Sequence, residues 1–376
     1  MSAALVAIVF GAVALGWSGA RWAVSLPQIA LYAITIARLR SISFPRAAWP
    51  LAAATAVGVL QLALDTTAYA FDTRMSLLFW IANLAAFTLA WNIPGERILT
   101  GILVTGSVIA VAGTVQLFTS PGRVFWLFDS GYQDLVIGPF VYRNQYAAFV
   151  ELLLPMAVAL GFFNPSLRLV CLLLAGFLYA SVIASGSRAG SAFVTCELLI
   201  FGWIGLRNRW CGWKPVAAAA LVSGAFVLVV GPESLLDRLR NQDEWGGRVE
   251  MATASVAMLR DRPWTGFGLG NWALAYPAYA TFDDGLFANQ AHSDWIEWAV
   301  EGGLPFALAL VAFAAVAIPA AVRRVWGLGI PFFLLHCLVD YPSRRQGLAL
   351  LFFTLAGLAI RRRASAARTQ ARWTPD

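Results

Sequence analysis

The chain has 376 residues, of which 60% are hydrophobic and only 12% are charged, with 27 basic and 20 acidic side chains. Soluble domains carry about 25% charged residues, so this composition excludes an ordinary soluble protein and predicts a membrane protein with many spans. The net charge of +7 does not indicate nucleic-acid binding, because the basic residues lie in short connections between apolar runs.

The first 230 residues are a succession of apolar runs. A run needs roughly 17–25 residues to cross a hydrocarbon core of about 30 Å. Nine candidate runs lie at about residues 2–19, 22–37, 48–70, 76–93, 97–118, 144–163, 167–185, 190–206 and 214–230. We therefore expect residues 1–230 to form transmembrane helices 1–9. The first run is expected to be a span and not a signal peptide, because it has no basic region before it.

Two connections in this part carry notable side chains. The connection at residues 119–143 ends in Arg143-Asn144 and contains the aromatic residues Phe125, Trp126, Phe128 and Tyr132. Aromatic residues at a membrane boundary are typical of an interfacial belt or a re-entrant element. The tight turn from Ser185 to Gly190 places Arg188 at the mouth of a helical hairpin.

Residues 231–302 form the single long polar segment of the chain. Apolar residues at helical spacing predict a helix from Gly247 to Arg262, which Pro263 ends. A second helix is predicted from Ser293 to Val300, with His292 at its start. The glycine-rich stretch between them, Gly266 to Asn271, follows no strand, so we expect a close-packing turn there and no nucleotide site.

Three more apolar runs, at 303–321, 325–340 and 346–361, raise the expected count to about twelve spans, followed by a tail at 362–376. If the N-terminus is cytoplasmic, the connections on that side carry most of the loop arginines, which is the bias expected of cytoplasmic loops. Both termini are then cytoplasmic, and residues 231–302 lie on the outer face between spans 9 and 10. The predicted fold is an all-α polytopic membrane protein.

The sequence gives no pattern for a metal or a cofactor. The four cysteines have no paired spacing, which argues against both a disulfide framework and a zinc site. Asp283-Asp284 has no third acidic or histidine ligand at a recognisable spacing, so a solvated loop is the better interpretation. We expect no metal and no cofactor.

His292 is the first candidate for catalysis. An imidazole has an ordinary pKa near 6.5 and can accept a proton at physiological pH. A lone histidine is often only a structural group, but His292 lies outside the predicted spans, beside Ser293 and Asp294. The second histidine, His336, lies within a predicted span and is interpreted as structural.

Three arginines, Arg143, Arg188 and Arg248, each adjoin a polar or glycine-rich turn at the outer face. Interfacial arginines often only extend toward lipid headgroups. Three of them flanking one histidine instead favour a diphosphate-binding site, because a guanidinium keeps its charge and binds phosphate through two donors.

Six fragments carry a family resemblance in their order along residues 130–360: Arg143-Asn144, Ser185 to Gly190, Gly247-Arg248, Arg262 to Asn271, Ala291 to Pro305, and Asp340-Tyr341-Pro342. Together they resemble the O-antigen ligase and polymerase superfamily of bacterial membrane glycosyltransferases. In the ligase pattern a histidine is followed by Asn, Ser or Gln, nine residues, and a glycine. Here His292, Ser293 and Gly303 match this pattern, and Phe306 departs from the Gly, Thr or Tyr expected later.

The resemblance implies a GT-C-like enzyme of the bacterial inner membrane that works without a metal and inverts the anomeric centre. It would transfer a glycan from an undecaprenyl-diphosphate carrier to an acceptor hydroxyl at the periplasmic face. His292 would be the catalytic base, while Arg188 and Arg248, assisted by Arg143, would bind the diphosphate.

The acceptor stays open at this point. An O-antigen ligase uses lipid A–core and serves lipopolysaccharide biosynthesis, a polymerase extends O-antigen or exopolysaccharide, and a protein O-oligosaccharyltransferase glycosylates protein. A transporter of polyprenyl-linked glycans is the alternative from another class. It is disfavoured because the candidate charges lie at the outer edge and not at the bilayer midplane.

Overall fold

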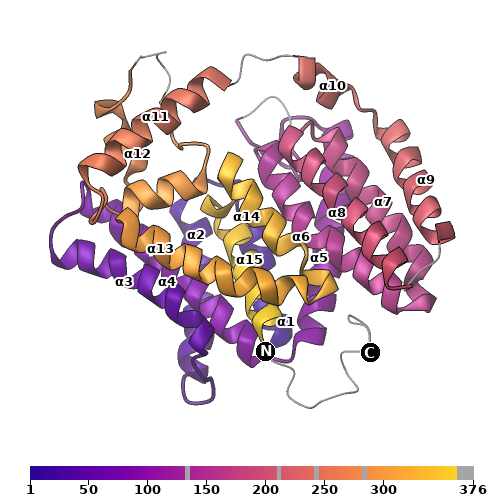
Figure 1. Cartoon of the computed structure of the whole chain (residues 1–376), viewed down its shortest axis with the longest axis horizontal. Coiled ribbons are helices and arrows are strands. Elements are labelled where there is room, and N and C mark those ends of the chain that lie inside the picture. The colour runs from indigo at the N-terminus through magenta and orange to yellow at the C-terminus, as the bar shows by residue number, and fades with distance from the viewer. Residues whose placement is uncertain (132–135, 210–212, 241–244, 282–284, 286, 362–376) are drawn as a thin grey trace.

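The computed structural model describes residues 1–131, 136–209, 213–240, 245–281, 285 and 287–361 (Figure 1). This part of the chain is mainly helical, as expected for an all-α polytopic membrane protein. The first eight helices are α1 (Ser2–Ala14), α2 (Arg21–Arg38), α3 (Trp49–Ala63), α4 (Ala70–Asn92), α5 (Gly95–Thr119), α6 (Arg143–Phe163), α7 (Arg168–Ala184) and α8 (Arg188–Arg207). The others are α9 (Trp213–Val230), α10 (Glu233–Arg240), α11 (Trp245–Asp261), α12 (Trp272–Ala275), α13 (Asp294–Val322), α14 (Gly329–Val339) and α15 (Gln346–Ile360).

Short 3-10 turns lie at the ends of several helices. They are η1 (Arg46–Ala48), η2 (Pro165–Leu167), η3 (Tyr276–Ala278), η4 (Val325–Gly327) and η5 (Pro342–Arg344). The exception to the helical pattern is a small antiparallel hairpin of β1 (Arg123–Val124) and β2 (Phe128–Asp129) in the aromatic connection. Within it, Phe125 and Trp126 have left-handed backbone angles, and the indole of Trp126 donates to the Thr119 hydroxyl at 2.7 Å.

Each of the twelve apolar runs contains a helix, but the expected count of twelve spans is not confirmed. Within the described residues, seven helices are long and apolar enough to cross a membrane: α4, α5, α6, α7, α8, α9 and α13. Crossing the hydrocarbon core takes about 20 helical residues. The apolar helices α1, α14 and α15 have only 13, 11 and 15 residues, which is shorter than this length.

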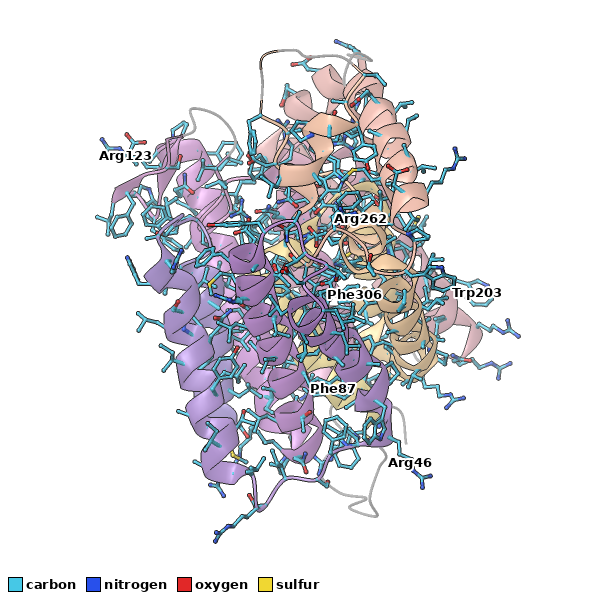
Figure 2. All side chains as sticks on the ribbon, turned by 90° about the vertical axis from the view of Figure 1, so that its left-hand side faces the viewer. Arg46, Phe87, Arg123, Trp203, Arg262 and Phe306 are labelled. Carbon is cyan, nitrogen blue, oxygen red and sulfur yellow. The ribbon has the colours of Figure 1, made fainter. Side chains whose placement is uncertain are left out.

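The helices form a bundle with two distinguishable ends. In Figure 2, Arg46 lies at one end and Arg262 lies toward the other; we call them the Arg46 end and the Arg262 end. The main core between these ends joins buried aromatic residues from several helices, among them Phe87, Phe149, Phe306 and Phe313. Phe87 and Phe313 meet edge to face, with ring centroids 5.5 Å apart, which ties α4 to α13.

Helices α10, α11 and α12 lie across the Arg262 end (Figure 1). The helix expected at Gly247–Arg262 corresponds to α11, which ends at Asp261 just before Pro263. This region has a small core of its own, in which Met258 and Trp272 are almost fully buried. Trp272 stacks on Tyr276 at 4.6 Å, and its indole donates to the Ser255 hydroxyl at 2.9 Å.

Helix α13 connects this small core to the main core. The helix expected at Ser293–Val300 begins at Asp294 and continues to Val322 through a kink at Gly303. Gly303 has φ 68° and ψ −176°, and the next residue, Leu304, donates its N–H to the Pro263 carbonyl at 2.7 Å. A glycine suits this position because a side chain is disfavoured at positive φ. The kink therefore separates residues 294–302 from the span that follows.

Candidate active site

His292 lies in the short loop before α13, at the Arg262 end. Its backbone φ is 54°, in the left-handed region that non-glycine residues rarely adopt. The imidazole packs edge to face against the ring of Tyr341, with centroids 5.2 Å apart, and the residue is half-buried. A rare backbone conformation is found most often where function depends on it. Because it is half-buried, the imidazole is positioned by its neighbours while part of it stays accessible.

The residues on both sides of His292 fix its position. Ala291 is buried in the small core with Trp272 and Val300, and its N–H donates to the carboxylate of Glu297. Ser293 caps α13 by accepting the N–H of Ile296 at 3.4 Å. The loop is therefore anchored once to the small core and once to the helix that follows.

Arg344, in η5, holds three acidic residues of α13. Its guanidinium lies 2.6 Å from Glu297, 2.9 Å from Glu301 and 3.7 Å from Asp294. Burial by itself would lower the pKa of Arg344, but the three carboxylates raise it above its ordinary value, so the guanidinium keeps its charge. Since Glu297 also accepts the N–H of Ala291, Arg344 connects η5 to the His292 loop through a single side chain.

The carboxylate of Asp340 joins three helices at the same place. It accepts a hydrogen bond from the side-chain amide of Asn144, and the Asn144 oxygen accepts one from the Ser187 hydroxyl at 2.7 Å. The Asp340 carbonyl accepts the N–H of Asp294 at 3.1 Å. The starts of α6 and α13 are therefore bonded to the end of α14, and the start of α8 is bonded to it through Asn144 of α6.

The four residues proposed from the sequence lie in or next to this junction. Arg143 and Arg188 are the first residues of α6 and α8. Arg143 directly precedes Asn144, and Arg188 directly follows Ser187. Arg248 of α11 donates to the Val339 carbonyl at 3.2 Å, one residue before Asp340. His292 contacts Tyr341, one residue after it. The segment Val339-Asp340-Tyr341 thus adjoins three arginine positions and the histidine, all of them half-buried.

Close packing between α6 and α8 holds Arg143 and Arg188 in this arrangement. A Cβ atom added at Gly190 would lie 2.2 Å from the Cβ of Ala147, so only a glycine allows the two helices to approach this closely. Ser187 caps α8 by accepting the N–H of Gly190 at 3.1 Å, after Gly186 has turned the chain at φ 68°. The serines and glycines of the Ser185–Gly190 turn therefore set the position of Arg188.

Tyr341 forms an aromatic wall of the site. Its ring lies between His292 and Tyr142, whose ring centroid is 6.2 Å away. Burial, reinforced by the negative charge of Asp340, raises the pKa of Tyr341 far above its ordinary value. The phenol therefore stays protonated at neutral pH and serves as a neutral hydrogen-bonding group beside the imidazole.

The glycine-rich stretch has a structural role, which involves Gly266, Gly268 and Gly270. All three have positive φ, and a Cβ at Gly266 would lie 2.3 Å from the carbonyl oxygen of Glu301. The N–H groups of Phe267 and Gly268 donate to the Val300 and Glu301 carbonyls at 3.0 and 2.9 Å. The stretch is a turn that packs its backbone against α13, as the sequence indicated.

Several other sequence features have structural contacts of their own. Phe306, which departs from the ligase pattern, is fully buried against Trp80 at 5.1 Å, so the departure falls in the main core. Arg262 lies over the ring of Phe267 at 4.7 Å. His336 pairs with Glu151 at 2.7 Å, both fully buried, which is a structural arrangement. Tyr132, Asp283-Asp284 and the tail at 362–376 lie outside the described residues.

Sequence reasoning missed Asn144, Asp340 and Arg344 as site residues. Asn144 and Asp340 are 196 positions apart, and each by itself resembles an ordinary polar residue at the end of a span. One signal for Arg344 was available: Asp294, Glu297 and Glu301 share one face of a helix that continues into an apolar span. Three acidic residues on such a face require a cationic partner when they are buried.

The junction combines a half-buried imidazole with nearby guanidinium groups, an arrangement suited to a substrate with a proton to lose and an anion to be held. Residues 169–312 match the family model described as O-antigen ligase. No curated protein matches the chain. The matched range contains Arg188, Arg248 and His292, and ends before Asp340 and Arg344. Residues 169–312 of this multi-pass membrane protein are therefore similar to the O-antigen ligase family.

Proposed function

We propose that the protein is a membrane glycosyltransferase that moves a glycan from an undecaprenyl-diphosphate carrier to an acceptor hydroxyl. The observation that carries this proposal is that Arg248 and His292 contact Val339 and Tyr341, while Arg143 and Arg188 directly adjoin Asn144 and Ser187, which are bonded to Asp340 and to each other. The family match supports the same class of reaction, since it covers three of these four residues. The positive-inside bias places the site at the periplasmic face of the bacterial inner membrane, with both termini cytoplasmic.

The arginines would bind the diphosphate of the carrier. A guanidinium stays charged and offers paired donors, so it stabilises a diphosphate as a metal ion does elsewhere. Arg248 of α11 bonds the Val339 carbonyl, while Arg143 and Arg188 are the first residues of α6 and α8, next to Asn144 and Ser187 of the junction. With cations from three helices, the site holds the charge that develops on the leaving group, and the reaction needs no metal ion.

His292 would act as the general base. Its imidazole takes the proton of the acceptor hydroxyl while the hydroxyl oxygen forms a bond to the anomeric carbon. The bond from that carbon to the diphosphate oxygen breaks, and its electron pair stays on the diphosphate beside the arginines. A single displacement of this kind inverts the anomeric centre. Tyr341 and the loop anchored by Ala291 would hold the imidazole in line with the acceptor.

For the acceptor we propose lipid A–core, which makes the protein an O-antigen ligase. The support is the spacing from His292 and Ser293 to Gly303, which matches the ligase pattern. The structure gives this spacing a physical basis, because Gly303 is the kink at which the site segment of α13 meets the span. A product assay decides the acceptor: glycan on lipid A–core supports a ligase, whereas lengthened carrier-linked glycan or glycoprotein replaces it with another member of the superfamily.

The base assignment is tested by His292→Ala in the full chain reconstituted with a lipid-linked donor. Loss of a general base typically lowers a rate by about 10²–10⁴-fold. We expect a loss in this range with donor binding unchanged. Thermal unfolding of the same variant, measured beside transfer, distinguishes loss of the base from loss of the fold. Full transfer by His292→Ala would remove His292 from its role.

The diphosphate assignment is tested by Arg188→Ala and Arg248→Ala, with Arg262→Ala as a matched control at the same end of the bundle. Each site variant should weaken donor binding and transfer together, whereas the control should change neither, because Arg262 stacks on Phe267. Unchanged donor binding in both site variants would contradict the proposed clamp. Movement of donor across vesicles without any transfer would instead favour a transporter.

A further inference from the structure

A large cavity lies between α6, α7, α8 and α9, toward the Arg46 end. Its volume is about 900 Å³, and its wall is mostly apolar. A volume of this size lies in the upper part of the range of small-molecule sites, which is about 300–1,000 Å³. At the inner end of the α7 wall, the polar residues Tyr179 and Thr195 hydrogen-bond each other at 3.2 Å, so the wall around them stays apolar.

Two basic residues line one end of the cavity. They are Arg168, at the start of α7, and Lys214, near the start of α9. Both side chains are exposed, and the Arg168 guanidinium also donates to the Gly161 carbonyl at 3.3 Å. An apolar cavity with two cations at one end suits an amphiphile that has an apolar chain and an anionic head.

The depth of the cavity matches one leaflet of a bilayer. On α7 its wall runs from Arg168 to Tyr179, and eleven helical steps of 1.5 Å span about 16 Å. Half of a hydrocarbon core of about 30 Å is about 15 Å. The wall is also open on the lipid side, because Leu169 and Leu199 line the cavity and are 67% and 68% exposed. A lipid of that leaflet can therefore enter laterally.

The glycan donor does not fit this charge pattern. Its diphosphate would bind near Arg188, which follows the far end of α7. With 17 residues, α7 separates Arg168 from that end by about 25 Å. A diphosphate held near Arg188 therefore leaves Arg168 and Lys214 without an anion.

From the cavity, its depth and its two cations we propose that this protein binds an anionic glycerophospholipid of the leaflet at the Arg46 end, with the headgroup phosphate at Arg168 and Lys214 and an acyl chain between α7 and α9. This site is separate from the candidate active site, and only the exclusion of the glycan donor from it rests on the proposed function.

The test is native mass spectrometry of the purified full chain with added phosphatidylglycerol, phosphatidylethanolamine or undecaprenyl diphosphate. The double variant R168Q/K214Q removes both cations, and R46Q/R97Q removes two arginines near the same end but outside the cavity. Each basic residue near an anionic headgroup contributes about a fivefold factor, so R168Q/K214Q should weaken phosphatidylglycerol binding roughly thirtyfold. R46Q/R97Q should not change it.

A second variant tests the apolar chamber by itself. Ala219→Phe fills part of the cavity and keeps both cations, so it should weaken binding of both phospholipids. Unchanged phosphatidylglycerol binding by R168Q/K214Q would overturn the headgroup assignment. If R46Q/R97Q weakened phosphatidylglycerol binding equally, the effect would be general attraction of the anionic lipid to a basic protein surface, and the proposed site would be wrong. Displacement of the phospholipid by undecaprenyl diphosphate would assign the cavity to the donor chain instead.

Discussion

Helices α6 and α9 have nearly the same mean hydropathy, 1.9 and 1.8, yet 78% of α6 and only 6% of α9 is buried within the protein. The buried helix carries Asn144, Gln145, Tyr146 and Glu151, whereas Ser223 is the single buried residue of α9. Polar groups inside a bilayer need partners, so they accumulate on helices that the protein surrounds. In this chain, polar residues distinguish the central helix from the peripheral one, and hydropathy does not.

The largest effect is expected at the buried ion pair of α6. Glu151→Leu removes the partner of His336, and breaking a buried pair on one side costs about 3–5 kcal/mol. Thermal unfolding in detergent should show this loss, whereas Ser223→Ala in α9 should unfold close to the wild type. The double variant E151L/H336F, which removes both members of the pair, should recover much of the lost stability; if it is no better than E151L, the pairing is not the cause.

The next effect concerns close packing. Gly190→Leu forces α8 away from Ala147 of α6 and should cost about 1–3 kcal/mol or more, with loss of transfer because Arg188 moves. The matched change in α9 is Gly224→Leu, where an added Cβ meets nothing within 4 Å. We expect this control to fold and transfer normally. Equal losses of stability and of transfer in the two variants would contradict the conclusion that α8 packs closely on α6 whereas α9 is peripheral.

A smaller change in stability is expected from Asn144→Ala, which removes the bonds to Ser187 and Asp340. Two lost hydrogen bonds cost about 1–3 kcal/mol. Transfer should fall further, by up to about a hundredfold, because small displacements of positioning groups have large effects on rate. Asn92→Ala is the control: Asn92 bonds Ser43 and Thr88 toward the other end, so its loss should leave transfer unchanged.

The smallest effect is expected on the lipid-facing side of α9. Leu228 is 83% exposed, so Leu228→Ala should change stability by less than about 0.5 kcal/mol. A melting curve that overlays the wild type is the expected result. A clear loss of stability would mean that α9 packs against a surface of a second molecule.

The sequence predicted the helices well because an apolar run is a local signal. All twelve runs contain a helix, and α11 and α13 begin within two residues of the expected positions. The lengths were less well predicted. In α14 the apolar run continues to Val339, but the helix starts only at Gly329, where a Cβ would lie 2.1 Å from the Glu151 carbonyl. Such a limit is set by a neighbouring helix and not by the run itself.

The candidate site was predictable in part for a similar reason. His292, Arg143, Arg188 and Arg248 adjoin turns that can be recognised locally. The Asn144–Asp340 hydrogen bond and the ion pairs of Arg344 with Glu297 and Glu301 join elements that are distant in the sequence. Long-range pairing of this kind has no signature in a single sequence. The position of α9 was equally inaccessible, because an apolar helix that faces lipid resembles one that faces protein.

The left-handed backbone of His292 lowers the stability of the loop, whereas the proposed mechanism requires the imidazole at this position. Glycine adopts a φ of 54° without strain, so His292→Gly would relax the loop while removing the imidazole. Selection of variants for thermal stability alone would therefore favour glycine at position 292, and selection for glycan transfer would favour histidine. Under the proposed mechanism, any attempt to stabilise the protein through its loops has to leave His292 unchanged, although its backbone is strained.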